Sequence, residues 1–168
     1  MDLLDRLLEH DRWTTRELLI CCRELADEQL DRDFDIGLRT LRATFHHIIR
    51  NMEIWSGLMA GRISPANRDE LSTDQSIEGL LGRLACAGPG LATLARSVAT
   101  RNGWDEHWID TFDDPPTEKS FGGAIAHILT HSMHHRSQVI HMMRRLGIAD
   151  VPEGDVLSWE GRAGGGSW

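Results

Sequence analysis

The sequence predicts an all-α protein that folds as a four-helix bundle, and three observations support this class. Apolar residues recur every three or four positions along four long segments, which is the spacing of one buried helix face. No segment alternates apolar and polar residues over enough positions to predict a sheet. The 168 residues are enough to bury a substantial core, so we expect one domain over residues 1–168.

The first helix is expected over residues 2–26, because leucines recur at helical spacing without Pro or Gly. Asp2 is suited to cap its N-terminus. The acidic segment 27–37 is expected to connect this helix to a second one over residues 38–60. Gly61 follows at the position where many helices end on a left-handed glycine.

A third helix is expected after a loop at residues 62–71. Ser72 and Gln75 have the spacing of a capping box, and the apolar pattern then continues toward Thr100. Gly88-Pro89-Gly90 lies inside this helix. Because proline cannot donate to the helical hydrogen-bond ladder, we expect a kink or a break there.

The last long helix is expected to follow an irregular insertion at residues 104–120, which forms either a small hairpin or an ordered loop. Two consecutive prolines before Thr117 predict that the helix starts there. This helix contains the histidine-rich stretch 121–147. A short helical piece near residues 156–159 and a flexible tail at 161–168 complete the chain.

The charge and composition argue against several classes of partner. With 18 Lys and Arg against 26 Asp and Glu, the net charge of −8 disfavours nucleic acid or an anionic membrane surface. No run of about 18 apolar residues predicts a membrane span. The acidic amphipathic N-terminus does not resemble a signal peptide, so we expect a cytoplasmic protein. The three cysteines, Cys21, Cys22 and Cys86, form no CxxC pair and predict no disulfide framework.

The stretch 121–147 contains five of the nine histidines: His127, His131, His134, His135 and His141. At about 3.6 residues per turn, His131 and His135 lie on one face, among apolar residues. His134 and His141 fall outside this face. Arg136 points away from it, and we expect it at the surface or in an ion pair between helices. Two buried imidazoles need partners, so this pair either binds one metal ion or forms hydrogen bonds in the core.

A metal site needs a third protein ligand, and the second helix offers one. His47 lies at the edge of its apolar face, in line with Asn51, whereas His46 lies on the opposite, solvated face. We therefore expect His47 to point inward. His127 is expected to be a core residue or to form a hydrogen bond across the bundle. His10, near the inward stripe of the first helix, is a weaker candidate.

Two stretches resemble the signature motifs of a known family. TLRATFHHIIRNMEIW (residues 40–55) and HILTHSMHHRSQV (residues 127–139) are similar to those of the DinB/YfiT-like metalloprotein superfamily. In that family a histidine precedes a tryptophan by two turns, and an HxxxHRxQ element follows in a later helix. Ser137 stands where the family usually has glycine, which keeps a small residue. The resemblance implies an up-down-down-up four-helix bundle and a divalent metal held by His47, His131 and His135.

The resemblance also implies a function, because several DinB-like relatives are enzymes that use low-molecular-weight thiols as cosubstrates. Three neutral imidazoles leave a divalent ion its full charge and at least one open position. The leading hypothesis is a metal-dependent transferase or isomerase that activates a small thiol and acts on a small electrophile near Trp55 and Trp13. The residues expected to line the substrate pocket or to support the ligands are Asn51, Trp55, His127 and Gln138.

Histidine nitrogens favour zinc or nickel as the metal, with iron and copper as further options. Two alternative functions stay open: a non-enzymatic metal-binding or stress-associated bundle, and a metal-assisted hydrolase. No glutamate stands at HExxH spacing, so a peptidase-like reaction is disfavoured and no general base is assigned. The exposed apolar residues left over from four amphipathic helices predict a homodimer.

Overall fold

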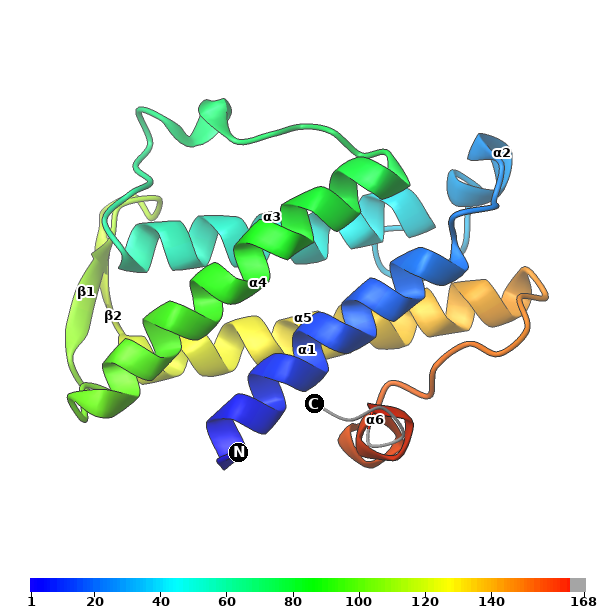
Figure 1. Ribbon diagram of the computed structural model, residues 1–168. Coiled ribbons are helices and arrows are strands. Elements are labelled where there is room, and N and C mark those ends of the chain that lie inside the picture. The colour runs from blue at the N-terminus through cyan, green and yellow to red at the C-terminus, as the bar shows by residue number, and fades with distance from the viewer. Residues whose placement is uncertain (164–168) are drawn as a thin grey trace.

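The computed structural model describes residues 1–163, most of which are helical (Figure 1). The four long helices are α1 (Leu3–Cys21), α3 (Leu41–Met59), α4 (Ile77–Thr100) and α5 (Phe121–Arg145). The shorter ones are α2 (Asp27–Leu30), the 3-10 turn η1 (Arg68–Glu70) and α6 (Val156–Ala163). The two strands are β1 (His107–Asp110) and β2 (Thr117–Ser120). The predominantly helical class is therefore confirmed.

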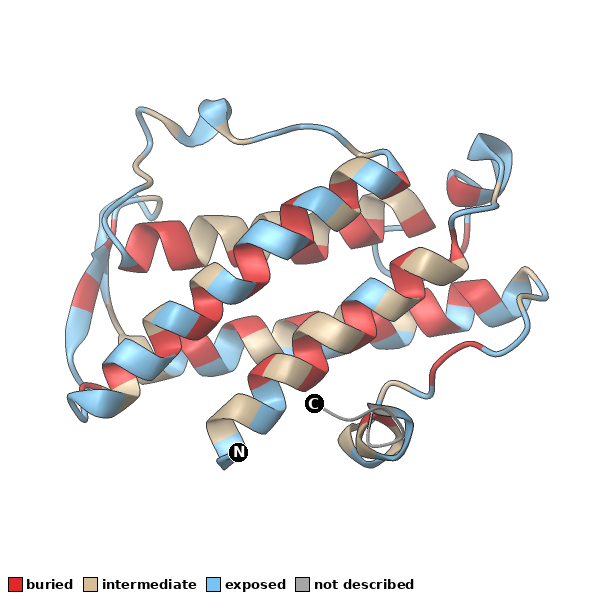
Figure 2. Cartoon of the chain, viewed as in Figure 1, coloured by how far each residue is buried: buried red, intermediate tan, exposed pale blue. Residues whose placement is uncertain are grey.

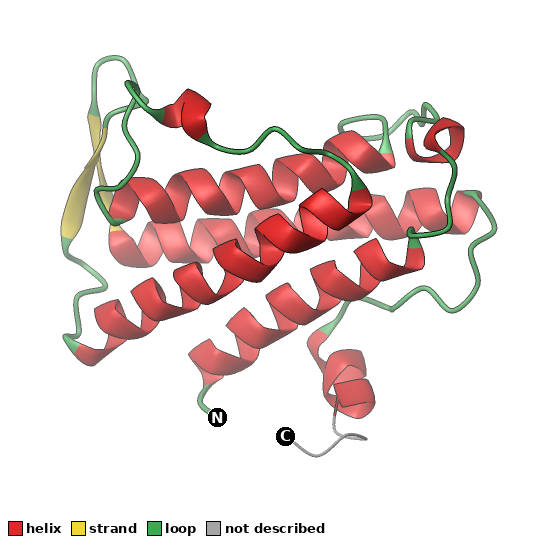
Figure 3. Ribbon diagram, turned by 45° about the horizontal axis from the view of Figure 1, so that its top comes forward, coloured by secondary structure: helices red, strands yellow, loops and turns green. Residues whose placement is uncertain are grey.

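The four long helices pack in a closed ring in which α3 contacts α4 and α5, and α1 contacts the same two helices. Figure 1 shows α1 and α5 running in one direction and α3 and α4 in the other. The hairpin of β1 and β2 lies at one end of the bundle, beside the end of α3 and the start of α5 (Figure 3). The loop that contains α2 lies at the opposite end.

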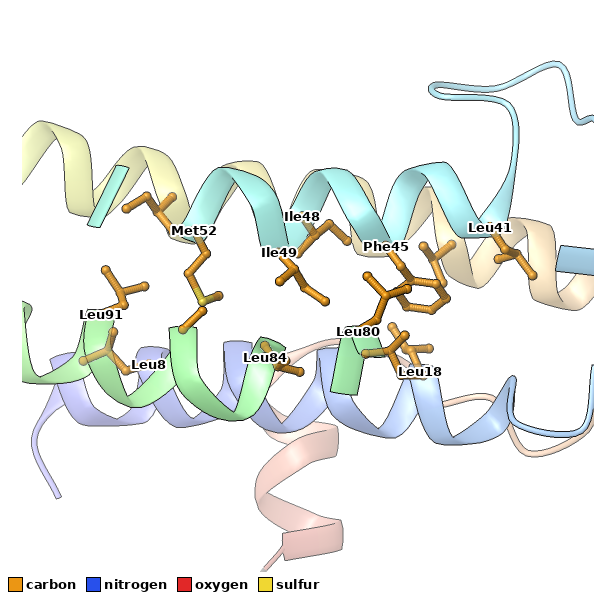
Figure 4. Close-up of a cluster of buried hydrophobic side chains, with 14 of the residues drawn as sticks. Leu8, Leu18, Leu41, Phe45, Ile48, Ile49, Met52, Leu80, Leu84 and Leu91 are labelled. Atoms are coloured by element: carbon orange, nitrogen blue, oxygen red, sulfur yellow. The ribbon is translucent and has the colours of Figure 1, made fainter. Parts of the chain in front are cut away.

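The core lies between the buried faces of these helices, which point toward one another in Figure 2. Side chains at helical spacing supply it: Leu8, Leu18, Leu41, Phe45, Ile48, Ile49, Met52, Leu80, Leu84 and Leu91 (Figure 4). Full burial of one such side chain stabilises the fold by about 1.5–3 kcal/mol relative to exposure. The apolar residues whose spacing predicted the helices are thus also the residues that pack the helices together.

The first two long helices differ from the prediction at their ends. Asp2 caps α1 as expected, since its Oδ1 accepts a hydrogen bond from the backbone N–H of Asp5 at 2.8 Å. However, α1 ends at Cys21, and the expected connection contains the short helix α2. Helix α3 begins at Leu41, after Thr40 as N-cap, rather than at residue 38. Gly61 adopts a φ of +66° at the end of α3, as predicted.

Helix α4 corrects two further predictions. Its N-cap is Ser76, whose Oγ accepts from the N–H of Gly79 at 3.0 Å, and not Ser72. The helix is continuous through Pro89, so the break, one of the two expected outcomes beside a kink, does not occur. Pro89 and Ala85, whose carbonyl loses its helical donor, are both exposed, so water can satisfy that carbonyl. Residues on both sides of Pro89 are buried, so packing in the bundle holds both halves of α4.

The insertion before α5 is a hairpin, one of the two structures expected. Strands β1 and β2 pair antiparallel, with Trp108 opposite Lys119. The prediction that the helix starts at Thr117 is wrong, because this residue begins β2. Helix α5 starts at Phe121, with Ser120 as its N-cap. The prolines therefore belong to the hairpin turn, and strand pairing overrides the local helix-start signal.

The C-terminal segment forms the short helix predicted near residues 156–159, extended to Ala163. The predicted flexible tail therefore begins within helix α6, and residues 164–168 lie outside the described part of the chain. Trp159, 2% exposed, anchors this helix and faces the ring of His10 at 6.0 Å between centroids. None of the helices in residues 1–163 has the length and apolar character needed to cross a membrane.

Candidate metal centre

Three histidine side chains converge between α3 and α5. The Nε2 atom of His131 lies 3.2 Å from Nε2 of His47 and 3.3 Å from Nε2 of His135. One ring nitrogen from each of the three lies within 4.8 Å of the others. A tetrahedral metal with ligand nitrogens at about 2.0–2.1 Å places those nitrogens about 3.3 Å apart. The spacing of this cluster therefore suits a single transition-metal ion.

The cluster belongs to a polar stripe that we call the α3–α5 seam, and helical spacing of four explains how it forms. It consists of His47, Asn51 and Trp55 of α3 and of His127, His131 and His135 of α5. Residues four apart stand above one another on a helix, and α3 and α5 pack together along these stripes. The seam thus brings together the three predicted ligands and three of the four predicted supporting residues.

The fourth supporting residue, Gln138, determines which nitrogen of His135 is free. Its Oε1 lies 2.8 Å from Nδ1 of His135. An amide oxygen only accepts, so Nδ1 of His135 donates and its Nε2 keeps a lone pair toward the cluster. The Nε2 of Gln138 donates to Nε2 of His134 at 3.0 Å. Gln138 therefore supports the cluster without belonging to it.

Gly37, which the sequence analysis did not single out, holds Gln138 in place. It has a φ of +51°, and a Cβ atom there would stand 2.2 Å from Oε1 of Gln138. The loop before α3 can approach this amide only because residue 37 has no side chain. In the sequence, Gly37 is simply a glycine in an acidic loop. Such a glycine indicates a turn, but it does not indicate a contact with another helix.

Asn51 approaches the other side of the cluster. Its Nδ2 lies 3.2 Å from Nδ1 of His131, so in this orientation the amide donates and His131 carries its proton on Nε2. That proton then bonds to His47 or His135. Metal binding requires a lone pair on Nε2 of His131, and turning the Asn51 amide by about 180° lets Oδ1 accept from Nδ1 instead. Asn51 can therefore stabilise His131 with its proton on Nε2 or on Nδ1.

The electrostatics of the cluster favour neutral imidazoles. Burial lowers the pKa of His47 and of His135 below the ordinary histidine value. For His131, burial and then the neighbouring histidines lower the pKa to about 4. Neutral rings near pH 7 are the form in which histidine binds metals. The cluster contains no carboxylate, so an ion bound there keeps its full positive charge.

The prediction for His46 is wrong in one respect. It does lie opposite the cluster, but it is half-buried, and Nη1 of Arg83 donates to its Nδ1 at 2.9 Å. Arg83 also donates to both carboxylate oxygens of Glu53, at 2.9 and 2.8 Å. The expected solvated face of α3 is therefore covered by α4. Burial and then the Arg83 charge lower the pKa of His46.

The surface interpretation of Arg136 is also wrong, whereas the ion-pair interpretation is right. Arg136 is only 2% exposed and pairs with Asp11 of α1. Helix α5 contacts α1 as well as α3, so a second face of it is buried. His10 lies on this other side, where its Nε2 is 2.9 Å from the carbonyl oxygen of Gly154. It is therefore not part of the cluster.

The seam continues from the cluster toward the hairpin. The rings of His131 and His127 are 5.2 Å apart, and those of His127 and Trp55 are 4.9 Å apart. The hairpin adds Lys119, with its Nζ 5.4 Å from the Trp55 ring. Lys119 was missed, although it is the only lysine in the sequence. Trp13 is half-buried on α1, which is not one of the two helices that form the seam.

The comparisons with known proteins agree with the motifs. The model of the DinB family matches residues 1–160, from before α1 into α6. The search of curated proteins found no match. The resemblance recognised from the two histidine-containing stretches is thus confirmed over nearly the whole described chain.

Proposed function

The chain belongs to the DinB family, and from this membership we propose that it is a metal-dependent enzyme using a small thiol. In this proposal it transfers the thiol to a small electrophile or uses the thiol to isomerise that molecule. The observation that carries the proposal is the 3.2 and 3.3 Å spacing of the three Nε2 atoms, without a carboxylate among them. Three neutral ligands suit a catalytic ion with an open position.

In this proposal His47, His131 and His135 hold one divalent ion, with zinc or nickel as the first choices and iron or copper as further ones. Such an ion, when bound, supplies a Lewis acid that lowers the pKa of a coordinated thiol. Gln138 and Asn51 fix the ring orientations of His135 and His131. The burial that lowers the three histidine pKa values keeps the rings unprotonated near neutral pH.

The proposed reaction balances without an oxidant or a reductant. The thiol loses its proton, and its sulfur forms a bond to an electrophilic carbon. The electron pair of the π bond at that carbon moves onto the rest of the substrate, which takes up a proton. In the isomerisation, the substrate loses that proton after rotation, the π bond re-forms, and the sulfur leaves with the C–S electron pair and takes up a proton to regenerate the thiol. The chain need only hold the two reactants in contact.

The wider proposal includes an up-down-down-up bundle that acts as a single domain, forms a homodimer and works in the cytoplasm on a small molecule. The helix directions in Figure 1 support the bundle order. Light scattering at micromolar concentration tests the homodimer. A monomer mass there would overturn it.

The first test is elemental analysis of the protein purified without a histidine tag, beside the double variant His131→Ala, His135→Ala. We expect about one equivalent of a transition metal in the wild type and none in the variant. No metal in either protein, even after reconstitution with zinc and nickel, would overturn the catalytic proposal.

Activity assays then separate the three functions. Turnover of an electrophile that needs both the metal and an added thiol supports the proposal. Turnover without any thiol indicates metal-assisted hydrolysis. Metal binding without turnover in a broad screen of thiols and electrophiles indicates a non-enzymatic metal-binding protein.

A further inference from the structure

A cavity of about 340 Å³ lies at the hairpin end of the α3–α5 seam. Its walls come from α3, β2 and α5: Trp55, Lys119, Ser120, Gly123, Ala124 and His127. His127 connects it to the metal-binding cluster, since its ring lies 5.2 Å from that of His131. The volume is near the lower end of the about 300–1,000 Å³ typical of small-molecule sites, so it suits a compact ligand.

Lys119 is the only cationic residue in the cavity wall. Its Nζ lies 2.5 Å from Oδ2 of Asp110 and 2.5 Å from Oδ2 of Asp113. An ammonium group has three N–H donors, so one stays available to a ligand after these two contacts. The three side chains together carry a net charge of about −1, because the two carboxylates outweigh the ammonium.

The first three N–H groups of α5 are already hydrogen-bonded. The N–H groups of Phe121 and Gly122 donate to the carbonyl oxygens of Glu106 and Trp104, at 3.0 and 2.9 Å. The N–H of Gly123 donates to Oγ of Ser120 at 3.1 Å. These three N–H groups are therefore not open to an anion, unlike those with which helix N-termini often bind one.

These charges decide what kind of ligand the cavity accepts. An anion would face the two carboxylates that already neutralise Lys119. A cation would compete with Lys119 for Trp55, over which the ammonium lies at 5.4 Å. A neutral ligand avoids both costs. An indole wall suits a flat unsaturated group, and the remaining N–H of Lys119 suits an acceptor oxygen.

We propose that this cavity binds the electrophilic substrate, and that the substrate is a small, neutral, conjugated carbonyl compound. This assignment rests on the function proposed above. The π system lies against Trp55, and the carbonyl oxygen accepts a hydrogen bond from Lys119. When the thiol sulfur bonds to the conjugated carbon, the π electrons move to that oxygen, and the thiol's proton ends on the product. Lys119 would stabilise the charge that develops on the oxygen.

The larger cavity, of about 660 Å³ between α3, α4 and the 62–71 loop, does not offer a comparable site. Its buried guanidinium, Arg83, donates to Glu53, to His46 and to the carbonyl oxygen of Asp74. None of the residues that line this cavity belongs to the α3–α5 seam.

The test uses binding rather than turnover. Growth with lysine labelled at Cε with ¹³C gives one side-chain NMR signal, because Lys119 is the only lysine. Acetophenone is the neutral conjugated carbonyl probe, and it does not react with thiols. Benzoate and trimethylanilinium are its anionic and cationic counterparts. We expect acetophenone to shift the Lys119 signal to saturation, and the two ions to bind at least about tenfold more weakly, or ~1.4 kcal/mol.

Matched tryptophan variants locate the site without removing the Lys119 charge. Trp55→Phe should weaken acetophenone binding, because the smaller ring covers less of the ligand, whereas Trp13→Phe, on α1 outside the cavity, should leave it unchanged. Unchanged thermal melting of both variants shows that the fold is kept. Benzoate binding as tight as that of acetophenone, no shift with any probe, or equal loss in both variants would overturn the proposal.

The experiment is done without thiol and without turnover, so its failure is distinct from failure of the proposed function. Loss of metal in the histidine variant together with no probe binding would retain the metal site and reject this substrate class. Probe binding in a protein that takes up no metal would retain a cavity for neutral conjugated carbonyl compounds and reject the metal-dependent reaction.

Discussion

At the scale of single residues, the candidate metal centre depends on side chains that adjust the ligands without touching a metal. Gly37 makes room for the Gln138 amide, and Gln138 leaves Nε2 of His135 with a free lone pair. Supporting groups of this kind typically change metal affinity by about 10–100-fold. Their position follows from contacts between segments far apart in the chain.

Substitution Gly37→Ala should weaken metal binding by about tenfold, because the new Cβ would displace Gln138 and release the ring of His135. The measurement is a competitive titration of zinc with a chromophoric chelator. Gly61→Ala is the matched control, since Gly61 also has a positive φ, of +66°, but a Cβ there meets open space. Both variants should lose about 1–2 kcal/mol of stability from backbone strain. Equal metal affinities in the two would contradict the role of Gly37.

A second feature at this scale is the buried ion pair of Arg136 with Asp11. Removing one partner should lower the free energy of unfolding. Arg136→Met should destabilise the protein by about 3–5 kcal/mol in urea unfolding, because it leaves a buried carboxylate without its partner. The double variant Asp11→Leu, Arg136→Met should recover much of this loss. Arg144→Met, also on α5, breaks an exposed pair with Glu153 of the loop that follows and should cost less than about 1 kcal/mol. An equally small effect of Arg136→Met would contradict this account.

At the scale of elements, α4 and the hairpin show packing overriding local signals. Helix α4 runs through Pro89, although a proline inside a helix costs about 3 kcal/mol. Strand β2 occupies the residues expected to start α5, and it brings Lys119 over Trp55. The hairpin therefore closes one end of the seam and forms a wall of its cavity.

Substitution Pro89→Ala should stabilise the protein by about 1–3 kcal/mol, because alanine restores an N–H donor to the carbonyl of Ala85. The midpoint of denaturant unfolding measures this. Gly82→Ala, at an exposed position of the same helix where a Cβ meets open space, should add only about 0.5–1 kcal/mol. If Pro89→Ala destabilises the protein, α4 requires a distortion at this point that alanine removes.

At the scale of the whole molecule, the lowered histidine pKa values couple folding to pH. Burial lowers the pKa of His131 to about 4 in the folded protein, against about 6.5 in an unfolded chain. Between these values the unfolded chain binds more protons than the folded one, so stability rises with pH in this window. The contribution is fully present above about pH 6.5 and is lost as the pH falls toward 4.

Metal-free protein should therefore lose about 1–2 kcal/mol through His131 between pH 6.5 and 4, since the half-exposed ring is partly screened by solvent. Urea unfolding across this range measures the loss, and His131→Gln should flatten the curve. Bound zinc should raise stability most at pH 7 and less at pH 5, because protons compete for the same nitrogens. A zinc effect independent of pH would argue against histidine ligation.

Local sequence patterns were sufficient to predict the four long helices and the three histidines that come together between α3 and α5. Apolar periodicity predicted four long helices, and spacing of four placed His131 and His135 on one face, because both depend only on local helix geometry. The choice of His47 over His46 followed from the same winding.

Two kinds of feature followed from packing alone: which further face of each helix is buried, and which residues far apart in the chain come into contact. Arg136 and His46 were misplaced because each helix packs against two neighbours, while periodicity reveals only its most apolar face. Gly37 beside Gln138, and Lys119 above Trp55, bring together residues from segments far apart in the chain. Such contacts follow from how helices and strands pack, which local spacing does not encode.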